Sequence, residues 1–120
     1  MPPAAGRNLA PRSFLAENES WPFGDLRPGS PPYARYAQTL ARRVQDLRAD
    51  HSLSERDVAT LVGVPNNTLS RVLRGDAVPD LVTIALLETG LRTRLLPDPA
   101  EGDEASGEAA GAALGHTSTM

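Results

Sequence analysis

The feature that most constrains the fold is a break in helical periodicity at Gly63, between two short amphipathic segments. Before the break, Ser54-Glu55-Arg56-Asp57 matches a capping box, in which a serine hydroxyl and a carboxylate three residues later satisfy free backbone amides at a helix start. Glycine tolerates the left-handed backbone of a tight turn, so we expect the helix to end at Gly63. Four apolar residues are expected on one side of this helix: Val58, Ala59, Leu61 and Val62.

A second short helix is predicted directly after this turn. Val64 offers an apolar side chain to the core, and Pro65 cannot continue a preceding helix but suits the first turn of the next one. Helical periodicity then runs from Asn66 to Arg74, and the following glycine ends it. The stretch 54–75 therefore predicts a helix-turn-helix. Its second helix has three inward-facing residues: Leu69, Val72 and Leu73.

A longer helix is predicted before this unit, from about Tyr33 to Ala49, with Pro32 at its start. Its apolar residues recur at three- and four-residue steps: Tyr33, Tyr36, Ala37, Leu40, Val44 and Leu47. The opposite side carries polar residues that we expect to be solvated: Arg35, Gln38, Arg42, Arg43, Asp46 and Asp50.

Charge divides the chain into three segments. Residues 1–32 balance three arginines against three acidic residues and contain seven prolines, which predicts a flexible arm. Residues 33–97 hold nine arginines against seven acidic residues, a net charge of +2, and form the predicted helix-turn-helix domain. Residues 98–120 carry five acidic residues and no arginine, which predicts a disordered acidic tail.

Composition excludes several classes of protein. The chain has no cysteine, which rules out disulfides and thiolate zinc sites and fits a reducing compartment. Aromatic residues make up only 4%, so the core must consist mainly of aliphatic side chains, which favours helices. The first residues lack the charged start and apolar run of a secretion signal, and no stretch is apolar enough to span a bilayer. We therefore expect a cytoplasmic protein without a membrane partner.

The sequence gives little support to an enzyme. His51 lies at a predicted turn and His116 in the predicted tail, and neither has a nucleophile or carboxylate nearby in sequence. No metal-ligand spacing or glycine-rich phosphate loop is present. We therefore expect no catalytic residues, no metal and no cofactor.

The stretch from Leu47 to Leu96 resembles the Cro and lambda-repressor-like family of bacterial regulators, also called the xenobiotic-response-element family. The residues that carry this resemblance are Leu53-Ser54, Val58-Ala59, Leu61, Gly63-Val64, Thr68-Leu69-Ser70-Arg71 and Arg74-Gly75. Downstream, Pro79 to Ala85 followed by Leu87-Glu88 and Leu91 resembles the fourth helix of the family. The resemblance implies an all-α domain of four to five packed helices that binds double-stranded DNA and regulates transcription.

In such a domain the helix after the turn lies in the major groove of DNA. The resemblance then implies three base-reading side chains, because an asparagine amide can pair with adenine and an arginine can pair with guanine. These are Asn66, Asn67 and Arg71. Contacts to the DNA backbone would come from Thr68, Ser70, Arg74, Arg48 and Arg56.

Each of these residues also has an ordinary structural interpretation. Asparagine is favourable at a helix start, where its side chain satisfies free amides. An exposed arginine is often only solvated, and Arg74 would also suit the negative end of a helix dipole. Two successive asparagines followed by Arg71 favour the DNA contact.

The sequence departs from the family pattern in three places. The loop after Gly75 is Asp76-Ala77-Val78 rather than basic, which removes a usual anchor for DNA. Glu55 stands where the family commonly has a glutamine that binds a phosphate, and a carboxylate would repel that phosphate. Leu73 stands where a glutamate commonly pairs with an arginine of the first helix, so Arg48 lacks that partner and could bind phosphate itself. We expect weak binding by one copy, with a homodimer or a partner supplying the remaining affinity. The candidate dimer surface is the leucine-rich end, although burial in the core is the first interpretation of these residues: Leu86, Leu87, Leu91, Leu95 and Leu96.

The alternative function is a protein-interaction module, such as an antitoxin or accessory protein whose helix-turn-helix binds a protein. The net charge of −3 and Glu55 favour it. So does the segment Trp21-Pro22-Phe23-Gly24-Asp25-Leu26, because apolar residues in an otherwise polar arm often fold on a partner. The same segment could instead tuck against the domain.

Overall fold

The structure is a computed structural model that describes residues 9–99. This part contains four α-helices: α1 (Pro32–His51), α2 (Glu55–Val62), α3 (Asn66–Leu73) and α4 (Leu81–Leu91). A 3₁₀ helix, Pro11–Phe14, precedes them, and no β-strand is present between residues 9 and 99. The predicted all-α fold of four to five helices is confirmed, with four in the described residues. None of the helices in this part has the length and apolar character needed to cross a membrane.

Local sequence signals account for the helix ends. The predicted capping box is present at the start of α2, where the Ser54 hydroxyl accepts from the Asp57 amide at 2.9 Å and the Asp57 carboxylate accepts from the Ser54 amide at 2.9 Å. Asp80 caps α4 by accepting from the Thr83 amide at 2.8 Å. The backbone N–H of Ser54, together with its hydroxyl, lowers the pKa of Asp57, and the bonds from Thr83 lower that of Asp80, because they favour the ionised carboxylates.

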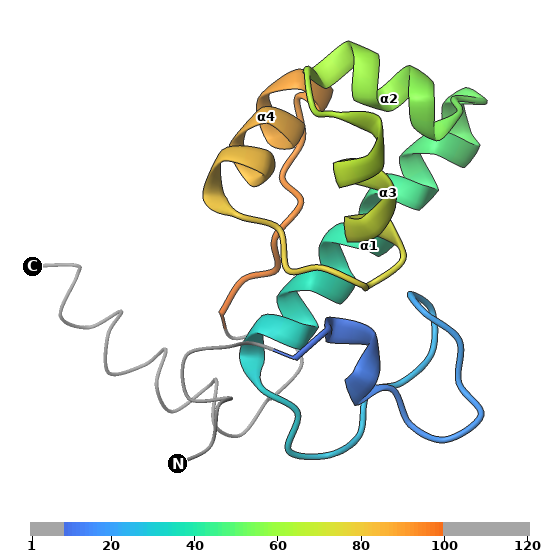
Figure 1. Ribbon diagram of the computed structural model, residues 1–120, viewed down its shortest axis with the longest axis vertical. Coiled ribbons are helices and arrows are strands. Elements are labelled where there is room, and N and C mark those ends of the chain that lie inside the picture. Colours follow the sequence, from blue (N-terminus) through green and yellow to red (C-terminus); the bar gives the residue numbers. More distant parts are fainter. Residues whose placement is uncertain (1–8, 100–120) are drawn as a thin grey trace, which may run out of the picture.

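The core lies between α1 and the three shorter helices. Figure 1 shows α1 crossing the molecule, with α2, α3 and α4 gathered along one side of it. The largest fully buried side chains are aliphatic, with one proline from the 3₁₀ helix: Leu40, Leu69, Leu73, Leu87, Leu95, Val44, Val58, Val72 and Pro11. Leu61 was expected on the buried side of α2, but it is 60% exposed. At 100° per residue it lies off the stripe formed by Val58, Ala59 and Val62.

The N-terminal segment, residues 9–31, packs against the domain, although the sequence predicted a flexible arm up to residue 32. The side chain of Gln38 is buried and donates to the Gly24 carbonyl at 2.6 Å. Arg42 donates to the carbonyls of Pro22 and Gly24, at 2.6 and 3.1 Å. Two residues of the polar face of α1, which we expected to be solvated, therefore bind backbone carbonyls of this segment.

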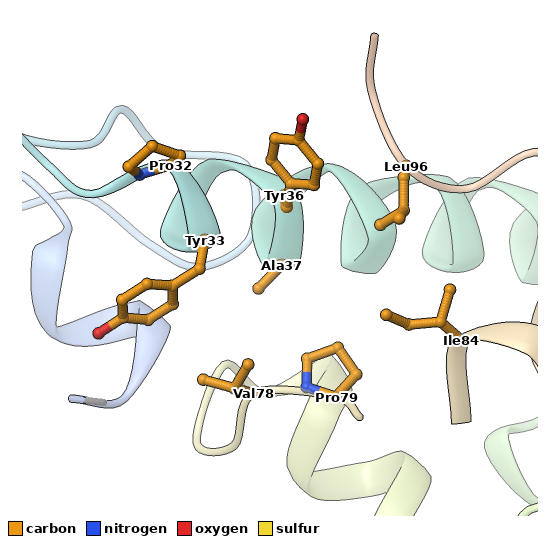
Figure 2. A pocket seen from close by; sticks show the side chains of 8 residues that line it. All are labelled: Pro32, Tyr33, Tyr36, Ala37, Val78, Pro79, Ile84 and Leu96. Carbon is orange, nitrogen blue, oxygen red and sulfur yellow. The ribbon is translucent and has the colours of Figure 1, made fainter. Parts of the chain in front are cut away.

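The start of α1 contributes to an apolar hollow of about 330 Å³. Figure 2 shows the two tyrosines on one side of it and the loop before α4 on the other. Its lining residues are Pro32, Tyr33, Tyr36, Ala37, Val78, Pro79, Ile84 and Leu96. None of these belongs to α2 or α3, so the hollow is separate from the helix-turn-helix.

The leucine-rich end is largely core. Leu87 and Leu95 are fully buried, Leu91 and Leu96 pack against the core, and Leu86 lies at its edge with 36% exposed. Core burial, the first interpretation from the sequence, therefore accounts for most of these residues. The acidic tail predicted over residues 98–120 lies outside the described residues from residue 100 on, as does His116.

Candidate nucleic-acid interface

The turn between α2 and α3 has the predicted geometry. Gly63 has the left-handed backbone, with φ of +83°. Its amide and that of Val64 both donate to the Ala59 carbonyl, at 2.9 and 3.1 Å. The side chains of Ala59 and Val64 are each only 4% exposed, so the small residue and the apolar residue both face the core. This turn fixes the direction in which α3 leaves α2.

The residues of α3 divide into a buried and an exposed side. Leu69, Val72 and Leu73 are at most 2% exposed and hold the inner side against the core. Six of the predicted DNA contacts lie on α3 or at its end; four of these are exposed and two are half-buried. The exposed ones are Asn66, Asn67, Arg71 and Arg74, and the half-buried ones are Thr68 and Ser70. The structure therefore brings six of the eight predicted residues together on one short helix and its end.

The two asparagines do not cap the helix that they begin. The N-cap residue of α3 is Pro65, and no side chain accepts a hydrogen bond there. Among the described residues, the structure gives the side chains of Asn66, Asn67 and Arg71 no hydrogen bond or ion pair. Their polar atoms are thus available to an external partner. The structural interpretation of the asparagines as capping residues does not apply here.

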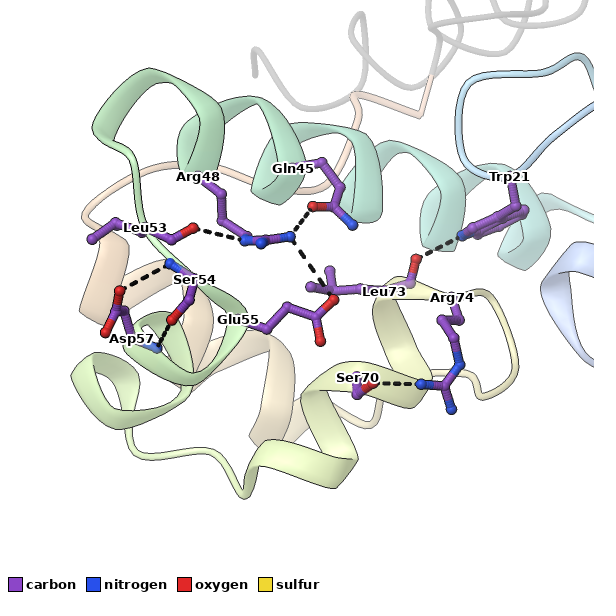
Figure 3. A network of polar contacts seen from close by, with 10 residues as sticks. All are labelled: Trp21, Gln45, Arg48, Leu53, Ser54, Glu55, Asp57, Ser70, Leu73 and Arg74. Atoms are coloured by element: carbon purple, nitrogen blue, oxygen red, sulfur yellow. Dashed lines mark hydrogen bonds and ion pairs between the residues drawn. The ribbon is translucent and has the colours of Figure 1, made fainter.

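Arg48 lies in a network that closes the connection between α1 and α2 (Figure 3). Its Nε donates to the Leu53 carbonyl at 3.0 Å, and its Nη1 donates to Oε1 of Gln45 at 2.5 Å. The same Nη1 lies 3.8 Å from Oε2 of Glu55. The sequence left Arg48 without a carboxylate partner, but the structure supplies Glu55 from the first turn of α2. Arg48 and Glu55 thereby partly neutralise one another.

Two further predicted residues lie at the end of α3. Arg74 donates to the Ser70 hydroxyl, as Figure 3 shows, and its Nε lies 3.0 Å from Oδ2 of Asp76. Arg12 forms a second ion pair with Asp76, with 3.0 Å between its Nε and Oδ1. Sequence reasoning missed Arg12, because nothing in the sequence signals that the N-terminal segment reaches this helix end.

Arg56 lies near the opposite end of α3. It lines a shallow hollow of about 440 Å³ together with Asn66 and the turn residues Gly63 to Pro65. Its side chain is exposed on the first turn of α2. Arginine side chains therefore lie near the start of α3, on its exposed side and at its end, which is the arrangement expected of a surface that meets phosphate on both sides of a groove.

Comparison with known proteins agrees with this geometry. The helix-turn-helix family model matches residues 44–96, which run from the middle of α1 to the segment after α4. Neither the curated proteins nor the solved structures gave a significant match. The family binds DNA, generally in transcription regulation, and is not typically enzymatic. Residues 44–96 of this chain match this helix-turn-helix family, and the match supports a lambda-repressor-like helix-turn-helix regulator.

Proposed function

We propose that this protein binds specific sequences of double-stranded DNA and thereby regulates transcription. The observation that carries the proposal is the exposed side of α3, where Asn66, Asn67 and Arg71 have no partner among the described residues. Exposed amide and guanidinium groups on a helix after such a turn suit the edges of bases in the major groove. Binding to genomic DNA would place the protein in the cytoplasm.

The residues divide into two proposed roles. Asn66, Asn67 and Arg71 read bases, whereas Thr68, Ser70, Arg74 and Arg56 contact the DNA backbone. Arg48 was expected to contact phosphate as well, but three of its polar contacts are internal, so we assign it to holding α1 against α2. Glu55 contributes to holding α1 against α2, because its carboxylate forms an ion pair with Arg48.

Selection from a random library of DNA duplexes by the full chain tests the proposal. We expect one enriched sequence, and we expect Arg71→Ala to lower the preference for it about 5- to 160-fold, since a bidentate pair contributes ~1–3 kcal/mol of discrimination. Arg94→Ala is the control, because it removes the same kind of side chain from a position that is 76% exposed and lies after α4, outside α3. Lack of any enriched duplex, or equal effects of the two substitutions, would contradict base reading by Arg71.

A homodimer remains part of this proposal, with its surface moved from the leucine-rich end to the start of α4. Leu81 and Val82 are 79% and 66% exposed there, which is high for large apolar side chains. Light scattering of the full chain with and without the selected duplex measures the number of copies. We expect two copies on the duplex, and one copy after Leu81→Gln; a single copy in both cases would argue against the dimer.

Protein binding through the same fold is the alternative function. The segment Trp21 to Leu26 supports this alternative less in the structure than in the sequence. Pro22 and Gly24 are buried against the domain, although Phe23 remains 60% exposed. Affinity for duplex DNA that falls steeply with salt supports the regulator. Co-purification of a protein that survives nuclease treatment, without any affinity for DNA, supports the module instead.

A further inference from the structure

The N-terminal segment is attached to the C-terminal end of α3 by contacts from two residues. The amide of Arg12 donates to the Gly75 carbonyl at 3.0 Å, and Nε1 of Trp21 donates to the Leu73 carbonyl at 3.1 Å. The indole packs so closely that a Cβ at position 75 would lie 2.6 Å from its Cε2 atom. The position of Arg12 relative to α3 is therefore fixed by backbone as well as side-chain contacts.

These contacts place Arg12 beside Arg74. The two arginines bind different oxygens of Asp76, each at 3.0 Å from Nε. Their side chains stay 58% and 55% exposed. Two guanidinium groups around one carboxylate leave a net positive charge at this end of the helix. The terminal nitrogens of Arg12 have no hydrogen bond within residues 9–99, so they remain available.

The register of α3 places this cluster next to the proposed reading surface. Asn67, Arg71 and Arg74 are spaced four and three residues apart, so they lie along one side of the helix. A helix of 8 residues is about 12 Å long, close to the width of about 12 Å of the major groove. A short helix with its first turn against the bases therefore has its far end near a phosphate wall of that groove.

We propose that Arg12, from outside the matched family segment, binds a DNA phosphate beside Arg74 and extends the interface beyond the helix-turn-helix. This inference rests on the proposed DNA binding by α3. It assigns the N-terminal segment a direct contact with DNA, in addition to its packing against α3. Arg12 adds affinity without sequence preference, because phosphates are the same at every base pair.

The test measures binding of the full chain to a fluorescent duplex enriched from the random library, over a range of salt concentrations. Arg12→Ala should make the slope of log K against log salt less steep by about 0.9, the effect of one lost phosphate contact, and leave the preference for the enriched sequence unchanged. Arg12→Lys should restore most of the slope. The control Arg94→Ala removes an equally charged, exposed side chain and should leave the slope as it is.

Asp76→Asn separates phosphate binding from a purely structural ion pair. If Arg12 binds phosphate, removing the carboxylate releases both arginines and should raise affinity. If Arg12 only holds the loop through Asp76, both Arg12→Ala and Asp76→Asn should lower affinity, and the proposal is wrong. An unchanged salt slope in Arg12→Ala with selective binding intact overturns this inference alone, whereas failure to enrich any duplex overturns the proposed function and this inference together.

Discussion

Replacing Gly75 by alanine should destabilise the protein more than the same change at Gly63, although both glycines have a left-handed backbone. Their φ angles are +76° and +83°. A Cβ at position 63 meets no atom within 4 Å, whereas a Cβ at position 75 would lie 2.6 Å from Cε2 of Trp21 and 2.9 Å from Cβ of Arg12. The left-handed conformation costs an L-residue ~1–2 kcal/mol. Gly63→Ala therefore measures the backbone contribution by itself.

Gly75→Ala adds the displacement of Trp21. Removing a buried aromatic side chain costs ~3–5 kcal/mol, and Trp21 is only partly buried, so about half of that is expected, ~2 kcal/mol. The lost hydrogen bond from Nε1 to the Leu73 carbonyl contributes ~1 kcal/mol. With the backbone contribution, Gly75→Ala should lower the free energy of unfolding by roughly 4 kcal/mol, against ~1–2 kcal/mol for Gly63→Ala.

Urea denaturation of the full chain, followed by far-UV circular dichroism, measures both values. The double variant Trp21→Ala, Gly75→Ala should cost less than the sum of the two single variants, because the missing indole no longer blocks the new methyl group. Equal losses for the two glycines, or additive losses in the double variant, would refute the packing of Trp21 on the end of α3.

Three further predictions use the same denaturation experiment. Trp21→Phe keeps most of the ring but removes its hydrogen bond, so it should cost ~1 kcal/mol; no change would mean that the bond is not formed in solution. Gln38→Ala removes the buried donor to the Gly24 carbonyl and should cost roughly 1–2 kcal/mol, whereas a neutral effect would argue against that contact. Asp57 and Asp80 have lowered pKa values in the folded protein, so their caps stabilise it above their ordinary pKa of 3.8 and this stabilisation is lost as the pH falls below that value. Asp80→Asn should therefore lose less stability between neutral pH and pH below 3.8 than the unsubstituted chain, and an equal loss would exclude the cap as the cause.

The helix-turn-helix could be predicted from the sequence because its signals are local. The capping box at Ser54 and Asp57 spans four residues, and the turn depends on one backbone conformation at Gly63. The inner face of α3 follows from helical spacing alone. These features need no knowledge of distant contacts, so the position of six predicted site residues on α3 and at its end could be derived from the sequence.

The parts that could not be predicted depend on contacts between residues far apart in the chain. Trp21 donates to a carbonyl 52 residues later, and Gln38 and Arg42 bind carbonyls of a segment whose prolines suggested flexibility. Proline also restricts the unfolded chain, so a proline-rich segment loses less entropy when it packs. Composition alone could not distinguish a flexible proline-rich segment from one that packs at low entropic cost. The polar face of α1 likewise gave no sign that it binds backbone carbonyls rather than water.

The N-terminal segment belongs to the unit that positions α3, because α3 is too short to hold its own position. Isolated helices below ~12–15 residues are marginal in water, and α3 has 8 residues. Its inner side is held by the core. At its end, Trp21 binds the carbonyl of Leu73 and Arg12 binds that of Gly75 in the following turn, and both donors lie outside the matched segment 44–96. Arg71 lies only two residues before the carbonyl that Trp21 binds. The direction of Arg71, which we propose reads a base, therefore depends on residues that the family match does not include.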